Sequence, residues 1–122
     1  MVLVDTSVWI SHLRAGRPAL ARLLEAGRVL CHPLVIGELA CGNLKRRSAI
    51  LGLLKNLPRA VVADDGETLL FIDGNRLAGS GLGYINVQLL ASTRLTGCLL
   101  WTDDATLQAA AKRLGVDFQP ED

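Results

Sequence analysis

Short apolar runs alternate along this chain with segments of helical periodicity, and this alternation restricts the possible folds more than any other feature. The apolar runs predict strands at 2–4, 28–31, 60–63, 98–101 and 116–118. Between them, apolar residues recur at helical spacing, and one predicted helix begins at Asp64 and Asp65 and carries apolar residues as far as Leu77. Strands that alternate with helices favour an α/β domain with a mostly parallel sheet and helices on both faces.

The size and charge of the chain set further limits. At 122 residues, it is long enough for its own core, so we expect a single domain over residues 1–122. Half of the residues are apolar but only 4% are aromatic, which predicts a core of aliphatic side chains. The net charge of +1 excludes a strong overall attraction to nucleic acid. The densest basic cluster is Lys45, Arg46 and Arg47.

The cysteines and the apolar runs bear on the cellular location. Cys31, Cys41 and Cys98 lack the paired spacing of zinc ligands, and we expect all three to be buried free thiols in a reducing compartment. The apolar run at the N-terminus is too short for a signal peptide, and no run approaches the roughly 18 apolar residues of a membrane span. We therefore expect a cytoplasmic protein without a membrane contact.

Acidic residues follow two of the predicted strands. Asp5 comes directly after 2–4, and Asp103 and Asp104 come after 98–101. Because functional groups gather beyond the carboxyl ends of parallel strands, we expect these side chains to converge on one edge of the sheet. Glu38 lies within a largely apolar predicted helix, where burial of its charge would be costly.

Such a set of carboxylates suits the hydrolysis of a phosphodiester. Clustered carboxylates repel one another, and a bound divalent cation removes this repulsion while it polarises a phosphate and activates a water. Hard cations such as Mg²⁺ prefer carboxylate oxygens. A structural explanation exists for each residue: Asp5 and Asp104 could cap helices, and Glu38 could pair with an arginine such as Arg14. The combination of the three carboxylates favours a metal site.

Three segments of the chain resemble motifs of VapC-type PIN domains in their order and spacing. They are VLVDTSVWI at 2–10, PLVIGEL at 33–39, and LLWTDD at 99–104 followed by Leu107. The resemblance covers essentially the whole chain. It implies a three-layer α/β/α PIN fold, an endoribonuclease that depends on Mg²⁺ or Mn²⁺ and cuts structured cellular RNA, and a toxin role in a type II toxin–antitoxin pair.

The resemblance also implies site residues and partners. The acidic metal-site residues that match the family motifs are Asp5, Glu38 and Asp104. Possible hydroxyl contributors are Thr6, Ser7 and Thr102, and Asp103 is a weaker acidic candidate. The implied partners are a cognate antitoxin protein, which packs on apolar faces of the early helices, a structured RNA substrate, and a second copy of the chain in a homodimer.

The chain departs from the family pattern at Asn86, where the pattern has an aspartate. An amide can offer one oxygen to a cation but no charge, so metal affinity and catalysis should fall by at least about 10- to 100-fold. Two explanations are open: deliberate inactivation of a toxin, which the retained motif residues favour, or a natural variant with weak or no activity. The alternative function is a catalytically silent PIN module that binds RNA or a partner protein.

Other chemically suggestive residues favour ordinary structural roles. The glycines Gly79, Gly81 and Gly83 lack the full dinucleotide fingerprint and predict a hinge or a tight entry to the next helix. His12 and His32 lack a relay to a serine or cysteine nucleophile and are interpreted as surface or packing residues. The two tryptophans, at positions 9 and 101, are expected in the core or in a groove.

Overall fold

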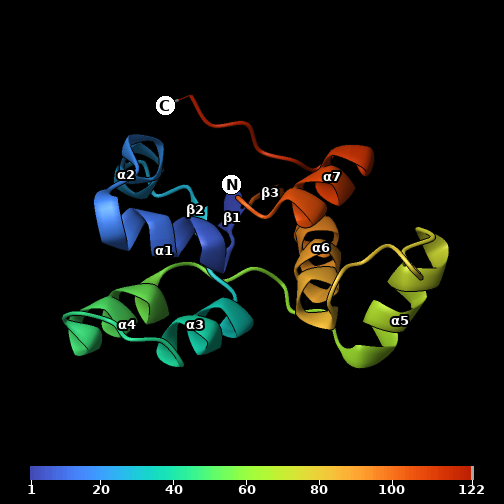
Figure 1. The fold of residues 1–122 in the computed structure, drawn as a ribbon, viewed down its shortest axis with the longest axis horizontal. Helices are drawn as coiled ribbons and strands as arrows, with labels where there is room; N and C mark the ends of the chain where they lie inside the picture. The colour runs from blue at the N-terminus through green and yellow to red at the C-terminus, as the bar shows by residue number, and fades with distance from the viewer. Residues whose placement is uncertain (122) are drawn as a thin grey trace.

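A parallel sheet forms the centre of the computed structural model, which describes residues 1–121 (Figure 1). Its strands are β1 (Val2–Val4), β2 (Val29–Leu30) and β3 (Leu99–Trp101), in the order β2-β1-β3. Both neighbours run parallel to β1, and Val2 is in register with Val29 and with Leu99. All three residues of β1 are buried, which explains its uninterrupted apolar sequence. The parallel order brings the carboxyl ends of β1 and β3 to the same edge.

The predicted outer strands at 60–63 and 116–118 are wrong: within the described residues, the only pairing near the first is a single bridge of Cys31 with Arg59, just before it, and the second keeps a single bridge of Leu100 with Asp117. After Arg59, side chains of the neighbouring helix compete for the backbone: the amide of Val61 donates to the Thr96 hydroxyl at 2.9 Å. The next ladder amide, that of Ala63, likewise donates to a serine hydroxyl of that helix at 3.3 Å. The apolar sequence at 60–63 therefore does not by itself keep this segment in the ladder.

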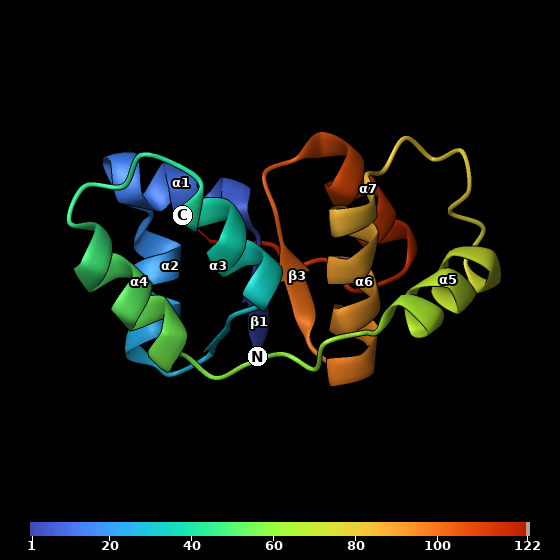
Figure 2. The ribbon, with the colours of Figure 1, turned by 90° about the horizontal axis from the view of Figure 1, so that it is seen from below.

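Seven helices flank the sheet within the described residues: α1 (Thr6–Ala15), α2 (Pro18–Glu25), α3 (Pro33–Ala40), α4 (Arg47–Asn56), α5 (Asp65–Gly74), α6 (Tyr84–Thr96) and α7 (Ala105–Arg113). Figures 1 and 2 show α1 to α4 on one side of the strands and α5 to α7 on the other. The arrangement is a three-layer α/β/α fold, as predicted. One boundary differs, because α5 ends at Gly74 and Leu77 is buried in the turn that follows.

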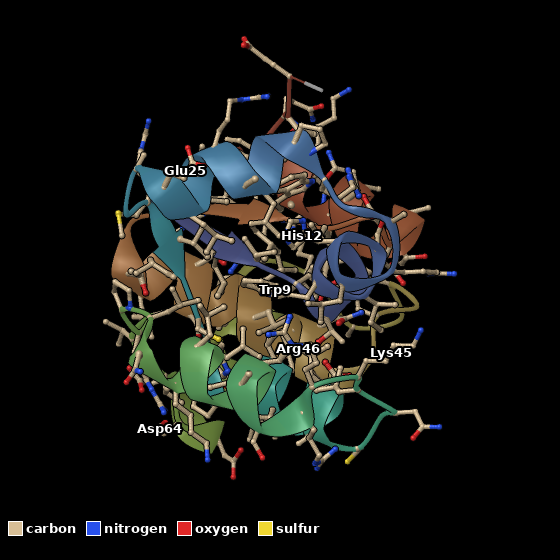
Figure 3. All side chains as sticks on the ribbon, turned by 90° about the vertical axis from the view of Figure 1, so that its left-hand side faces the viewer. Trp9, His12, Glu25, Lys45, Arg46 and Asp64 are labelled. Carbon is tan, nitrogen blue, oxygen red and sulfur yellow. The ribbon has the colours of Figure 1, made fainter. Side chains whose placement is uncertain are left out.

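The core is aliphatic, as predicted from the composition. Leucines from five different helices are fully shielded from solvent, namely Leu20, Leu39, Leu54, Leu89, Leu90 and Leu107. Burying such a side chain is worth about 1.5–3 kcal/mol, so these helices are held on the sheet mainly by the hydrophobic effect. Trp9 and Trp101 are buried as well, and Figure 3 shows Trp9 between α2 and α4.

The expectation that all three cysteines are buried is only partly confirmed. Cys31 and Cys98 are buried, and burial raises the pKa of both thiols. Cys41 is exposed because it directly follows α3, where the chain leaves the core. Within residues 1–121, no helix is both long and apolar enough to cross a membrane.

Candidate functional site

Asp5 is the best-anchored acidic residue at the edge of the sheet where β1 and β3 end. Its side chain is only 5% exposed. Carboxylate Oδ1 accepts the amide N–H of Thr6 at 2.8 Å, which makes Asp5 the N-cap of α1. Oδ2 accepts the hydroxyls of Ser7 at 2.8 Å and Thr102 at 2.7 Å. Three donors therefore fix the orientation of this buried carboxylate.

Glu38 joins the same edge from α3, but the expectation of a buried glutamate is wrong. The buried residues of α3 are Val35 and Leu39, while Glu38 lies on another face and is exposed. Its Oε1 accepts the Thr6 hydroxyl at 2.7 Å, so its partner is Thr6 and not Arg14. Because the Glu38 carboxylate is in contact with water, its charge is not desolvated and needs no buried partner.

Asp104 approaches from the β3 side, where it is the N-cap of α7. Its Oδ1 accepts the amide of Leu107 at 2.8 Å, and its own amide donates to the Thr102 hydroxyl at 3.0 Å. Thr102 is buried and donates that hydroxyl proton to Asp5. Capping and clustering are thus not alternatives here, since Asp5 and Asp104 cap helices and also belong to one hydrogen-bonded network.

Asp103, the neighbour of Asp104, turns away from this network. Its Oδ2 lies 2.7 Å from Nη1 of Arg17, and the guanidinium of Arg17 also lies 5.2 Å from the centroid of the Trp101 ring. The backbone of Asp103 still belongs to the site, because its amide donates to the Ser7 hydroxyl at 3.0 Å. The two adjacent aspartates therefore have different surroundings.

Asn86 is half-buried in the first turn of α6, and Figure 2 shows this end of α6 beside the start of α7. A Cβ on Gly81, in the loop before α6, would lie 3.9 Å from the Thr106 side chain, so this loop passes close to the first turn of α7. Within residues 1–121, no hydrogen bond joins the Asn86 amide to the three carboxylates. The structure links Asp5, Glu38 and Asp104 by hydrogen bonds, and none of these bonds includes Asn86.

The oxygen donors of this site suit a hard divalent cation. Within the described chain, no three acidic, His or Cys side chains lie close enough to enclose an ion by themselves. Mg²⁺ does not need such a cage, because it usually keeps several waters and binds one or two carboxylates together with substrate phosphates. Glu38 and Asp104 each use one carboxylate oxygen in the hydrogen bonds described above. The chemistry of the donors therefore fits Mg²⁺ or Mn²⁺.

The histidines lie outside the acidic network, and His32 is a packing residue as predicted. It caps α3, because Nδ1 accepts the amide of Leu34 at 3.0 Å, so Nε2 carries the proton toward the Ser92 hydroxyl at 3.1 Å. Burial lowers the pKa of His32, and the charge of Arg59 lowers it further. The pKa of His12 is also lowered, mainly by burial.

Two features of this region are absent from the sequence predictions. One is Arg17, whose contact with Asp103 spans 86 positions of sequence, a separation without a local signal. The other is an open groove of about 480 Å³ that begins at the first turn of α7, directly after Asp104. Its lining includes Leu77, Ser80, Leu82, Thr106, Ala109 and Arg113. Of this groove, the sequence singles out only the glycine-rich loop on one wall, as a hinge or a tight entry to the next helix.

Comparisons with known proteins agree with this architecture. The family described as "PIN domain" matches residues 2–113, and the chain therefore belongs to the PIN-domain family. It is 47% identical over 122 residues to "Ribonuclease VapC32" of Mycobacterium tuberculosis, in strains CDC 1551 / Oshkosh and ATCC 25618 / H37Rv. The alignment covers 99% of this chain and 98% of each relative. The resemblance to VapC-type PIN domains is thereby confirmed.

A solved structure supports the fold independently. It is described as "Structure of FitAB bound to IR36 DNA fragment", and it superimposes with a TM-score of 0.62. The similarity covers 92% of this chain and 91% of that chain. At 17% identity, it is evidence for the three-layer fold alone.

Proposed function

We propose that this chain is a metal-dependent endoribonuclease and the toxin of a type II toxin–antitoxin pair, weakened by Asn86. The observation that carries the proposal is the network at the edge of the sheet, where Thr6 and Thr102 connect the carboxylates of Asp5 and Glu38 with the backbone amide of Asp104. A nearly full-length relative described as a ribonuclease supports the same chemistry.

In this proposal Asp5, Glu38 and Asp104 hold Mg²⁺ or Mn²⁺, and Asn86 contributes a neutral oxygen. The bound cation supplies charge stabilisation at the phosphate and lowers the pKa of a water. The chain contributes orientation: Asp5 is fixed by three donors, and the Thr102 hydroxyl connects it with the backbone of Asp104. Glu38 remains accessible to solvent and hence to substrate.

Asn86 is the reason that we expect weak metal binding and weak RNA cleavage from this chain. Loss of a supporting hydrogen-bond partner typically costs about 10- to 100-fold in metal affinity or activity, and loss of a ligand charge should cost at least as much. Restoring the carboxylate with Asn86→Asp should raise both. The first turn of α6 has no acidic residue, so the new carboxylate would also interact favourably with the helix dipole.

The test compares cleavage of total cellular RNA by the chain as it stands and by Asn86→Asp, in Mg²⁺ or Mn²⁺ and with a chelator. The matched control is Asn43→Asp, which adds the same charge at an exposed position after α3. Cleavage should rise at least about tenfold for Asn86→Asp alone and should stop with the chelator. Failure of both forms to cut any RNA would contradict the proposal.

The second candidate is a silent PIN module that binds RNA or a partner protein, and the neutral Asn86 favours it. Under this hypothesis both forms bind RNA in a gel-shift assay and neither cuts it. Metal-dependent cleavage by the unaltered chain would exclude the second candidate. The two candidates thus differ in one measurement on the same pair of proteins.

The partners in this proposal are a structured RNA, a cognate antitoxin, and a second copy of the chain in the cytoplasm. Exposed apolar side chains on α1 and α4, among them Ile10, Leu13 and Leu53, support the expected antitoxin contact on the early helices. Co-expression with the cognate antitoxin should yield a stable complex. Replacing Ile10 and Leu53 by Asp should weaken that complex without reducing cleavage.

A further inference from the structure

Arg17 connects the turn between α1 and α2 with the corner that follows β3. It is the N-cap of α2, and its side chain is 21% exposed. Nη1 donates to Oδ2 of Asp103 at 2.7 Å and to the Ser11 hydroxyl at 3.5 Å. The guanidinium also lies over the ring of Trp101, the last residue of β3. A planar guanidinium can make such contacts at the same time, whereas an ammonium cannot.

The corner at 102–104 is tied down at each of its residues. Thr102 donates to Asp5, and Asp104 donates its amide back to Thr102. Asp103 has contacts on two sides: its amide donates to the Ser7 hydroxyl and its carboxylate accepts from Arg17. Because Ser7 donates in turn to Asp5, the ion pair is continuous with the network around that carboxylate.

We propose that Arg17 is a positioning residue for the metal site, acting through Asp103 to hold Thr102 and Asp104 in place. This inference rests on the proposed function for its consequence in metal binding. Arg17 has a second effect in the same direction, because it directs the Asp103 carboxylate away from the network and leaves Asp104 as the acidic residue of this corner.

The sign of the effect separates positioning from simple charge. The positive charge of Arg17 repels a cation at the neighbouring site, so an effect through charge alone predicts tighter metal binding when Arg17 is replaced. Release of the Asp103 carboxylate would also tighten binding. Positioning predicts the opposite, since loss of an outer contact to the ligands weakens metal binding by about 10- to 100-fold in comparable sites.

The first experiment measures Mn²⁺ binding without RNA by electron paramagnetic resonance, in the Asn86→Asp background. We expect Arg17→Gln to weaken binding by about tenfold or more, and Arg17→Lys to recover part of the loss because it keeps one charged donor. Asp103→Asn should weaken binding as well, and Arg17→Gln should add little to it. The control, Arg22→Gln, removes the same charge from an exposed position on α2 that contacts the Glu121 carbonyl.

A second measurement decides the inference even if the proposed metal chemistry fails. Amide hydrogen exchange in the metal-free protein reports directly whether the corner is held, and Arg17→Gln should raise exchange at Asp103 and Asp104 but not in the helix core of α6. Unchanged exchange, or Mn²⁺ binding as tight as in the parent, would overturn the inference. If the parent itself binds no Mn²⁺, the proposed function fails while the exchange data still test the role of Arg17.

Discussion

Replacing Thr102 by valine tests whether its hydroxyl holds the site together. Valine has nearly the same shape, so the change removes the hydroxyl without opening a cavity. The hydroxyl donates to the Asp5 carboxylate at 2.7 Å and accepts the Asp104 amide at 3.0 Å, and the residue is buried. A hydrogen bond to a charged group contributes about 1.5–3 kcal/mol. The Asp104 amide is only partly buried, so the loss of its acceptor should cost about 1 kcal/mol, the low end for an unpaired donor.

These two effects predict that Thr102→Val lowers the free energy of unfolding by about 2–4 kcal/mol, because the added methyl group offsets part of the loss. With a urea m-value of about 2 kcal/mol/M, which is typical of small proteins, the unfolding midpoint should move down by about 1–2 M. Metal-dependent cleavage by Asn86→Asp should also fall at least about tenfold when Thr102→Val is added, since Asp5 and Asp104 lose their common partner.

The assay is equilibrium urea unfolding followed by circular dichroism, with Thr106→Val as the control. Thr106 is exposed in the first turn of α7, so its replacement should leave the free energy of unfolding within about 0.5 kcal/mol of the parent. If Thr102→Val unfolds at the same urea concentration as the parent, the Thr102 hydroxyl does not stabilise the connection between Asp5 and Asp104. A midpoint shift without any loss of cleavage would limit its role to stability.

Two further predictions concern pH and the basic loop. Because the pKa of His32 is lowered in the folded protein, the unfolded chain takes up a proton first, and stability should fall as the pH drops below about 6.5. His32→Asn keeps an N-cap residue and should flatten this dependence in urea unfolding at pH 7.5 and 5.5; an equally steep dependence in that variant would refute the assignment. Replacing Lys45, Arg46 and Arg47 by alanine should weaken RNA binding and flatten its salt dependence. Figure 3 shows Lys45 and Arg46 in the connection between α3 and α4. Arg47 also donates to the backbone carbonyls of Ala40, in α3, and of Gly42, just after it, so its replacement could disturb the fold. The double variant at positions 45 and 46 is therefore the cleaner test, and unchanged RNA affinity in that variant would place the RNA on another face.

The edge of the sheet could be predicted because its determinants are local. A short apolar run that stops at an aspartate specifies both a strand and the N-cap of the next helix, and this holds for Asp5 and for Asp104. The outer strands could not be predicted in the same way. At 60–63, the amides of Val61 and Ala63 bond to hydroxyls of α6 that are about 30 residues away in sequence. At 116–118, the backbone bonds to that of Leu100 in β3 and to that of α7.

The exposure of Glu38 shows a different limit. The apolar composition of α3 favoured burial, but helical periodicity places Glu38 away from the face that Val35 and Leu39 share. The position of a residue around the helix axis therefore predicts its burial better than the overall composition of the helix does. The contact between Arg17 and Asp103 had no such local signal, because it depends on how the turn after α1 packs against the end of β3.

Two of the three acidic residues, Asp5 and Asp104, lie at helix starts, and this placement helps the fold to tolerate several carboxylates at one edge. Asp5 caps α1 and Asp104 caps α7, so each carboxylate accepts a backbone amide at the positive end of a helix dipole. Asn86 occupies the first turn of α6, whose N-terminus has no side-chain cap. The fold thus provides a third favourable place for a carboxylate that this chain leaves neutral. The amide at position 86 removes negative charge where the fold could support it, so its cost should appear mainly in metal binding, with about 0.3–1 kcal/mol of stability lost through the helix dipole.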